Sequence, residues 1–131
     1  MKIQECVNVG FFTLANIMPT FDVVFNSMIV GTSELERGDA PMGVAVGRFF
    51  PTENYAVIQE KCIGNHEDQS ELELVVMTSK GQIIECVGVA VLDFSPDLGP
   101  EAIELNVLGI PYPLYGEIFP HHVASYDRQF K

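Results

Sequence analysis

The histidines and acidic residues near the C-terminus have the types and spacing that could bind a metal ion. His121 and His122 are adjacent, and Glu117 and Asp127 are close in sequence, so nitrogen and carboxylate ligands are both present. Neighbouring residues of an extended chain point to opposite sides, and this spacing matches no closed zinc pattern. We therefore predict ordinary polar residues here and a protein that binds no metal.

A cysteine and a histidine four residues apart could instead form a nucleophile and its base. This would require one helix to carry both Cys62 and His66, but Gly64 and Asn65 predict that the helix ends first. Nucleophilic catalysis also needs a third group that orients the base. We predict no catalytic residue and a protein that is not an enzyme. The three cysteines form no CxxC pair, which predicts reduced thiols.

Nucleotide and nucleic-acid binding are not indicated by the sequence. Residues 43–48 (GVAVGR) contain neither GxGxxG nor GxxxxGK[ST] and include no lysine. The seven basic residues are scattered and form no basic stripe. Residues 1–5 do not begin a signal peptide, and no apolar stretch has the length of a bilayer span. We expect a cytoplasmic protein without a cofactor, a nucleic-acid partner or a membrane partner.

The distribution of charge is the strongest functional signal. The formal net charge is −11, and eleven acidic residues against the single base Lys80 lie between Lys61 and Arg128, which gives −10 for that stretch. Such a one-sided field attracts basic surfaces, repels phosphates and accelerates encounter with a cationic partner. Paired carboxylates such as Glu71 and Glu73 could act as acid and base, but their outward alternation is more typical of a solvated face.

Small size, single-domain character and an acidic half are also features of one class of inhibitor. In this general character, although through no motif, the chain resembles the small immunity proteins of bacterial contact-dependent inhibition and related polymorphic toxin systems. The resemblance implies a non-catalytic protein that neutralises a basic partner, a nuclease-type toxin above all, by protein–protein binding. The residues predicted to bind this partner are exposed acids and two aromatic anchors: Glu67, Asp68, Glu71, Glu73, Asp97, Glu101, Glu104, Tyr112 and Tyr115.

Two other functions stay open at this point. A small enzyme or ligand-binding domain would use a pocket between sheet and helix with Cys62, His66, His121 or His122. A strongly perturbed titrating group in such a pocket would favour it. A homo-oligomeric scaffold component would instead pair strand edges between copies.

Strand patterns dominate the elements that must position these residues. Residues 21–30 are rich in β-branched and aromatic residues and end at Gly31, and a polar loop is predicted at 32–41. Residues 42–50 return to a strand with small residues on one face, so another element should pack closely there. Residues 101–108 alternate, with their apolar side chains on one side.

The clearest pattern predicts a hairpin. Residues 71–78 and 82–94 are apolar runs around Lys80 and Gly81, which are typical of a tight turn. We predict that the two runs pair antiparallel and form the centre of the sheet, with the side chains of Val75 and Val89 in the core.

One helix is expected at residues 52–63. Thr52 is a suitable N-cap, and Gly64 a natural stop. The predicted buried face consists of Tyr55, Ile58 and Cys62. The C-terminal part is predicted to be irregular, with one helical turn near residues 114–118. The expected fold is therefore α+β: a single globular domain of residues 1–131, with a mainly antiparallel twisted sheet of about five strands and one helix packed on a face.

Overall fold

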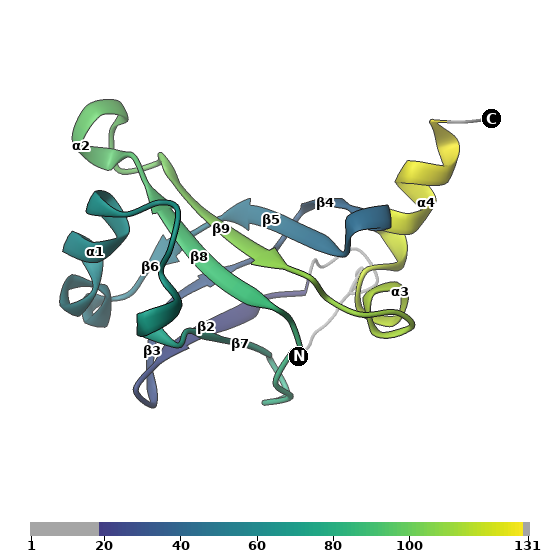
Figure 1. The fold of residues 1–131 in the computed structure, drawn as a ribbon, viewed down its shortest axis with the longest axis horizontal. Helices are drawn as coiled ribbons and strands as arrows, with labels where there is room; N and C mark the ends of the chain where they lie inside the picture. Colours follow the sequence, from purple (N-terminus) through teal and green to yellow (C-terminus); the bar gives the residue numbers. More distant parts are fainter. Residues whose placement is uncertain (1–18, 130–131) are drawn as a thin grey trace, which may run out of the picture.

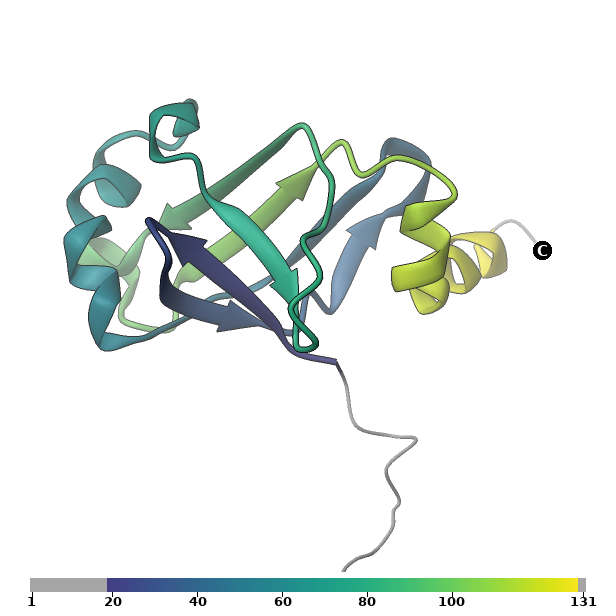
Figure 2. The ribbon, with the colours of Figure 1, turned by 90° about the horizontal axis from the view of Figure 1, so that it is seen from below.

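Two antiparallel sheets pack against each other around one core, as Figure 1 and Figure 2 show. The computed structural model describes residues 19–129. The first sheet has the order β6 (Phe50–Pro51), β3 (Met28–Ser33), β2 (Phe21–Phe25), β7 (Val75–Thr78), and the second has the order β4 (Arg37–Asp39), β5 (Val44–Arg48), β9 (Ile103–Leu108), β8 (Gly88–Asp93). The α+β class and the antiparallel pairing are confirmed. The single sheet of about five strands is wrong, because the strands divide into two sheets of four.

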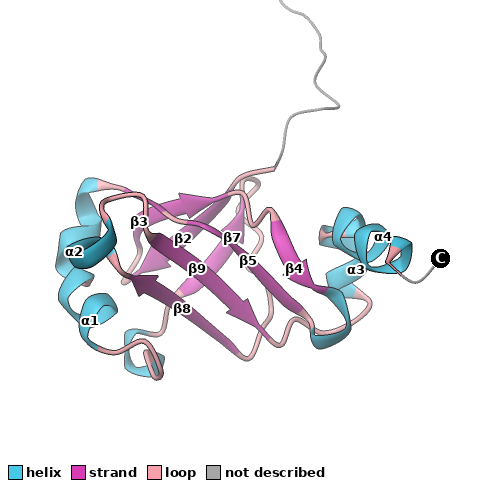
Figure 3. Ribbon diagram, turned by 90° about the horizontal axis from the view of Figure 1, so that it is seen from above, coloured by secondary structure: helices cyan, strands magenta, loops and turns pink. Residues whose placement is uncertain are grey.

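Short helices lie at the two ends of this sandwich (Figure 3). One end carries η3 (Glu53–Val57), α1 (Gln59–Gly64) and α2 (Ser95–Leu98), and the other carries α3 (Leu114–Ile118) and α4 (Pro120–Arg128). Two 3-10 turns, η2 (Ala40–Met42) and η4 (Ser70–Leu72), lie in the connections. Within residues 19–129, no helix is long and apolar enough to cross a bilayer.

The predicted strand at residues 21–30 is in fact the hairpin of β2 and β3. Asn26 and Ser27 have φ angles of 48° and 66° and form a two-residue connection between the paired residues Phe25 and Met28. Positive φ at both central residues is typical of a type I′ turn, whose twist suits a hairpin. Gly31 does not end the strand, since β3 continues to Ser33. The predicted loop at 32–41 is also partly wrong, because it contains β4.

The small-residue face of β5 is confirmed, and the element that packs closely there is the chain just after β3. A Cβ on Gly47 would lie 2.7 Å from the Cα of Leu35, which is closer than two such atoms approach. In the same way, a Cβ on Gly31 would overlap the ring of buried Phe49. Glycine at these two positions therefore allows the sheets to approach each other across the core.

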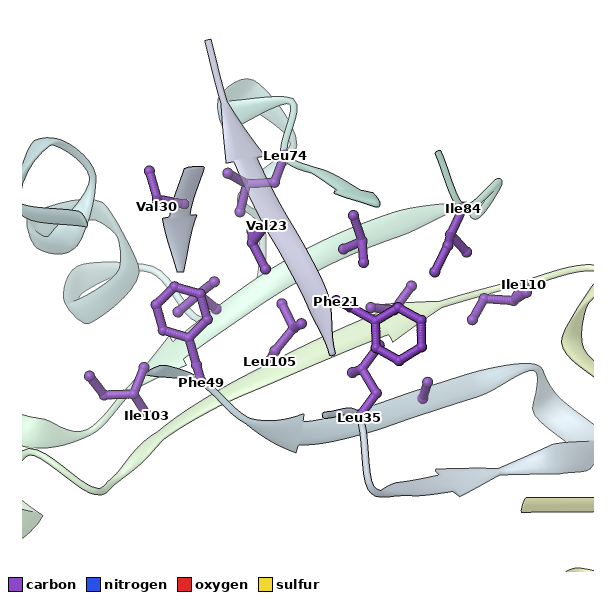
Figure 4. Close-up of a cluster of buried hydrophobic side chains, with 14 of the residues drawn as sticks. Phe21, Val23, Val30, Leu35, Phe49, Leu74, Ile84, Ile103, Leu105 and Ile110 are labelled. Carbon is purple, nitrogen blue, oxygen red and sulfur yellow. The ribbon is translucent and has the colours of Figure 1, made fainter. Parts of the chain in front are cut away.

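The core itself is filled from both sheets, and Figure 4 shows fourteen of its side chains, ten of them labelled. The alternation predicted for residues 101–108 is confirmed, because Ile103, Leu105 and Val107 on central strand β9 are buried. Across from them, the first sheet contributes Phe21 and Val23 of its central strand β2. This arrangement holds the two edge strands β7 and β8 on either side of the same apolar layer.

The helix predicted at residues 52–63 is present but divided into η3 and α1. The Thr52 hydroxyl accepts a hydrogen bond from the Asn54 N–H (3.2 Å), as expected for an N-cap. The predicted buried face is confirmed, because Tyr55, Ile58 and Cys62 are all buried. These two helices lie at one end of the sandwich, where α1 contacts β8 and η3 contacts β3.

The predicted hairpin at residues 71–94 is only partly correct. The turn exists, since the Thr78 N–H donates to the Gln82 carbonyl (2.8 Å) and the Ile84 N–H donates to the Val76 carbonyl (2.9 Å). After Ile84 the chain leaves the first sheet, and β8 pairs with β9 of the second sheet. Strands β7 and β8 are therefore edge strands of different sheets and do not form a common centre.

Two further predictions are corrected by this topology. Val75 and Val89 are half-buried, and the fully buried valines of these strands are Val76 and Val91.

The helical turn predicted near residues 114–118 is confirmed as α3. The rest of the C-terminal part is not irregular, because α4 follows with Pro120 in its first turn. Cys6, one of the predicted reduced thiols, lies outside the described residues.

Candidate partner-binding surface

A groove beside edge strand β8 brings acidic and apolar side chains together. Its cavity volume is about 260 Å³. We call it the acidic groove and define it by six of its lining residues, three acidic and three apolar: Glu67, Asp68, Glu73, Val87, Val89 and Leu108. Val87 is 87% exposed, and in the described part of the chain no lysine or arginine lines the groove. Exposed apolar surface next to acids in a lining without lysine or arginine is suited to a basic, partly apolar partner.

The acids of the groove lie on an ordered segment. The Asn65 side-chain oxygen accepts hydrogen bonds from the backbone N–H groups of Glu67 (3.1 Å) and Asp68 (3.0 Å). Asp68 in turn accepts from the N–H (3.0 Å) and the hydroxyl (2.7 Å) of Ser70. These bonds from Ser70 stabilise the carboxylate and hold the pKa of Asp68 below its usual value. The backbone at Glu67 and the carboxylate of Asp68 are therefore held at defined positions, which lowers the entropy cost of binding.

Gln69 covers one position of the β8 edge, as a neighbouring strand would. Its side-chain N–H donates to the Val91 carbonyl (2.7 Å), and its side-chain oxygen accepts from the Val91 N–H (2.8 Å). The side chain of Gln69 is itself buried, with 3% exposure. Further along the same edge, the His66 ring nitrogen Nε2 lies 3.2 Å from the Asp93 carbonyl oxygen. Side chains thus occupy both backbone groups of Val91 and the carbonyl of Asp93 along this edge.

The remaining predicted acids are divided between other places. Glu71 forms an ion pair with Lys61. Glu101 and Glu104 line a separate cavity that also contains Arg37, and the Arg37 guanidinium lies 2.9 Å from the Glu104 carboxylate. Asp97 is exposed on α2. Only three of the seven predicted acids, those of the acidic groove, share one hollow that contains no base.

The two predicted aromatic anchors lie outside the acidic groove, around α3 at the end of the sandwich away from α1 and α2 (Figure 1). Tyr112 is 53% exposed, and its hydroxyl donates to the Ala40 carbonyl (2.7 Å). Tyr115 is fully buried, and its hydroxyl lies within hydrogen-bond distance of the Val44 carbonyl (2.8 Å). The prediction that Tyr115 is a surface anchor is therefore wrong in this fold, because the helical turn of α3 directs its ring into the core.

The adjacent histidines occupy different environments. His122 is buried, with Nδ1 2.9 Å from the Tyr115 hydroxyl and Nε2 3.0 Å from the Leu35 carbonyl. Its ring stacks on Phe119 at 4.7 Å, whereas His121 is exposed. Because both nitrogens of His122 are engaged, the ring joins α4 to the chain before β4. Within residues 19–129, no three His, Cys, Asp or Glu side chains form a group that could hold a metal.

The buried ring of His122 makes stability depend on pH. Burial and the neighbouring His121 lower the pKa of His122, outweighing the opposing influence of Leu35 and Glu36. Its pKa in the folded state therefore lies below the unfolded value of about 6.5. The stability that the neutral ring contributes is complete above this value and is lost as pH falls toward the lower folded pKa.

We expect the free energy of unfolding, measured with urea, to decrease between about pH 7 and pH 5. His122→Gln removes the titrating group, so its free energy should decrease less over the same range. The contribution of His122 is the difference between the two proteins in how steeply the free energy of unfolding changes with pH. Parallel profiles for the two proteins would contradict this assignment.

A buried carboxylate at the α1 end was not predicted from the sequence. Asp93 accepts hydrogen bonds from the Tyr55 hydroxyl (2.6 Å) and the Ser95 N–H (2.8 Å), and Gln59 contacts it at 3.4 Å. Burial opposes ionisation, but the bonds from Ser95 and Tyr55 outweigh it, so the pKa of Asp93 lies below its usual value. Asp93 thereby ties η3 and α1 to the end of β8. The sequence does contain an indication of this burial. Asp93 lies two residues after buried Val91, and in a strand such side chains point to the same face.

Cys62 lies beside this cluster and is a protonated thiol. Burial raises its pKa to about 11, despite a hydrogen bond with Tyr55 that opposes the shift. The thiolate is the nucleophilic form of cysteine. His66, the base considered for Cys62, is engaged with the Asp93 carbonyl and packs against Phe94 at 4.4 Å between ring centroids. These contacts therefore engage Cys62 and His66 in packing and hydrogen bonding.

Comparison of the chain with protein-family models, with curated proteins and with solved structures finds no match in any of the three.

Proposed function

We propose that this chain is a non-catalytic acidic binding protein that neutralises a basic protein partner. The observation that carries the proposal is the acidic groove, in which Glu67, Asp68 and Glu73 lie next to exposed Val87 and, in the described part of the chain, no lysine or arginine belongs to the lining. The partner class we favour is a nuclease-type toxin, which would make the chain an immunity protein.

The chemistry of such a pair is complementary. A nuclease needs a cationic surface to hold the phosphates of its substrate. Carboxylates held in fixed positions can bind that surface in place of phosphates, and their field accelerates the encounter. The apolar part of the groove supplies the desolvated contact that slows dissociation, because buried apolar groups contribute most to the centre of an interface.

The environment of the other reactive side chains supports a role in binding rather than catalysis. Cys62 is buried with a raised pKa, and both ring nitrogens of His122 are engaged with Tyr115 and Leu35. A pocket of about 420 Å³ next to Tyr55 and Gln59 is present, but these side chains bond to Asp93 and so are committed to the fold.

The test is to capture the partner from the native host and to measure association with it. We expect a basic protein whose association rate falls steeply as ionic strength rises to about 0.15 M, where charges are screened beyond about 8 Å. The dissociation rate should change much less, because it depends on short-range contacts. An acidic partner, or an association rate that does not change with salt, would contradict the proposal.

A further inference from the structure

We infer that the acidic groove binds an extended basic segment of the partner, which adds to the open edge of β8 as a further strand. This inference rests on the proposed function, because it names the kind of contact that the acidic groove makes. Three features of the described residues carry it: the direction of the β8 backbone, the side chains that already close part of its edge, and the charge of the groove.

The backbone direction follows from the register. In an antiparallel pair, successive residues alternate between bonding to the partner strand and pointing away from it. Val91, paired with Leu105 of β9, directs its N–H and carbonyl away from β9, because both bond to the Gln69 side chain. Val89 lies two residues earlier in the same unbroken register, so its N–H and carbonyl point to the same side.

That side is the acidic groove, which Val89 itself lines. Gln69 satisfies the edge at Val91 and His66 contacts the carbonyl of Asp93, but no described residue bonds to the outward N–H or carbonyl of Val89. Side chains therefore occupy both outward groups of Val91 and the outward carbonyl of Asp93, whereas both outward groups of Val89 are open. An unpaired pair of backbone groups of this kind is a template for another strand.

The charge of the groove selects the occupant. Glu67, Asp68 and Glu73 face any chain that lies along the open edge, and in the described residues no base in the lining opposes them. Alternate side chains of an added strand would point to opposite faces. Basic residues on one face would meet the three carboxylates, and apolar residues on the other would cover Val87 and Leu108, both exposed.

The probe is a blocked eight-residue peptide of alternating lysine and valine, measured with the full chain at low ionic strength. Two matched peptides carry N-methyl groups on either the lysine or the valine amides, which removes the donors of one strand edge and keeps the charge. At least one of them should bind about tenfold more weakly, because it loses the one donor that faces the Val89 carbonyl and its methyl group holds the added strand away from the edge. Equal binding of all three peptides would overturn the inference.

Hydrogen exchange of the full chain provides a second readout. In the unbound protein the Val89 amide should exchange rapidly and the Val91 amide slowly, and the peptide should protect Val89. Slow exchange of Val89 before the peptide is added would overturn the inference, because another segment of this chain would then occupy the edge. Val89→Pro removes the outward N–H at an edge strand together with a half-buried side chain. Once circular dichroism shows that this variant is folded, it should bind the parent peptide more weakly, by about as much as N-methylation does.

A charge variant separates this inference from the proposed function. If Glu67→Lys with Glu73→Lys weakens all three peptides equally and N-methylation has no effect, the groove binds basic chains by charge alone. The edge contact is then refuted, and the acidic binding function is retained. If the parent peptide does not bind and the same variant binds the natural partner unchanged, both are refuted.

Discussion

Val91→Asp should unfold the protein, whereas Val87→Asp, only four residues earlier, should leave it folded. Val91 is fully buried between the sheets, and its backbone is already committed to Gln69. A carboxylate at this position has no partner, and burying a polar group without one costs about 2–7 kcal/mol, more for a charge. Since total stability is typically about 5–15 kcal/mol, this substitution removes most or all of it.

The control variant, Val87→Asp, makes the same substitution at a solvent-exposed position. Val87 is 87% exposed, so an aspartate there is hydrated and should change the free energy of unfolding by less than about 0.5 kcal/mol. Circular dichroism with urea titration distinguishes the two variants directly. If both variants unfold at the wild-type midpoint, the assignment of β8 to the core through Val91 is incorrect.

Reversal of two acids in the acidic groove should reduce the association rate with the basic partner by about tenfold or more. Glu67→Lys with Glu73→Lys changes the local charge by four units at exposed positions that contribute little to packing. Steering by a field of one sign increases association rates by about 10- to 1,000-fold, and this field is reversed locally in the variant. Stopped-flow association at low ionic strength measures the effect.

The matched control reverses two acids at the other end of the molecule, Glu117 on α3 and Asp127 on α4. The net charge of this control equals that of the groove variant, so a difference between them reports location rather than total charge. We expect a decrease of less than about threefold for Glu117→Lys with Asp127→Lys, because screening limits the influence of distant charges. If the control is the more damaging variant, the interface lies at the α3 and α4 end.

Several elements could be predicted because local rules and burial agree. The alternation at residues 101–108 identified β9 and its buried face, since a strand packed on one side requires that period. The capping residue Thr52 and the spacing of Tyr55, Ile58 and Cys62 identified the helical segment at the α1 end. Its division into η3 and α1 could not be predicted from that apolar pattern, which fits a continuous helix equally well.

The errors have specific physical causes. Apolar residues continue through the turn at Asn26 and Ser27, so the hairpin of β2 and β3 looked like one strand; its signal was the tolerance of asparagine for positive φ. In residues 82–94, continuous apolar character hid the place after Ile84 where the chain passes from one sheet to the other. The hydrophobic pattern indicates that both parts of this segment are buried, but it does not indicate which strand each part pairs with.

Of the acidic groove, only the charged residues could be predicted from the sequence. Glu67, Asp68 and Glu73 were expected at the surface because unpaired carboxylates must be hydrated, and all three are exposed. The groove they share with β8 depends on the edge position of that strand, which is a property of the whole topology. The role of Gln69 had no sequence signal, because a single glutamine between charged residues looks like any surface residue.

The open edge of β8 also affects how copies of this protein behave toward one another in concentrated solution. Two such edges could pair with each other, as unprotected strand edges do in aggregation. The carboxylates beside Val89 oppose this, since two copies would bring like charges together along the new contact. Salt therefore has two effects at the acidic groove: screening weakens the attraction of a basic chain, and it also weakens the repulsion that opposes pairing of two copies.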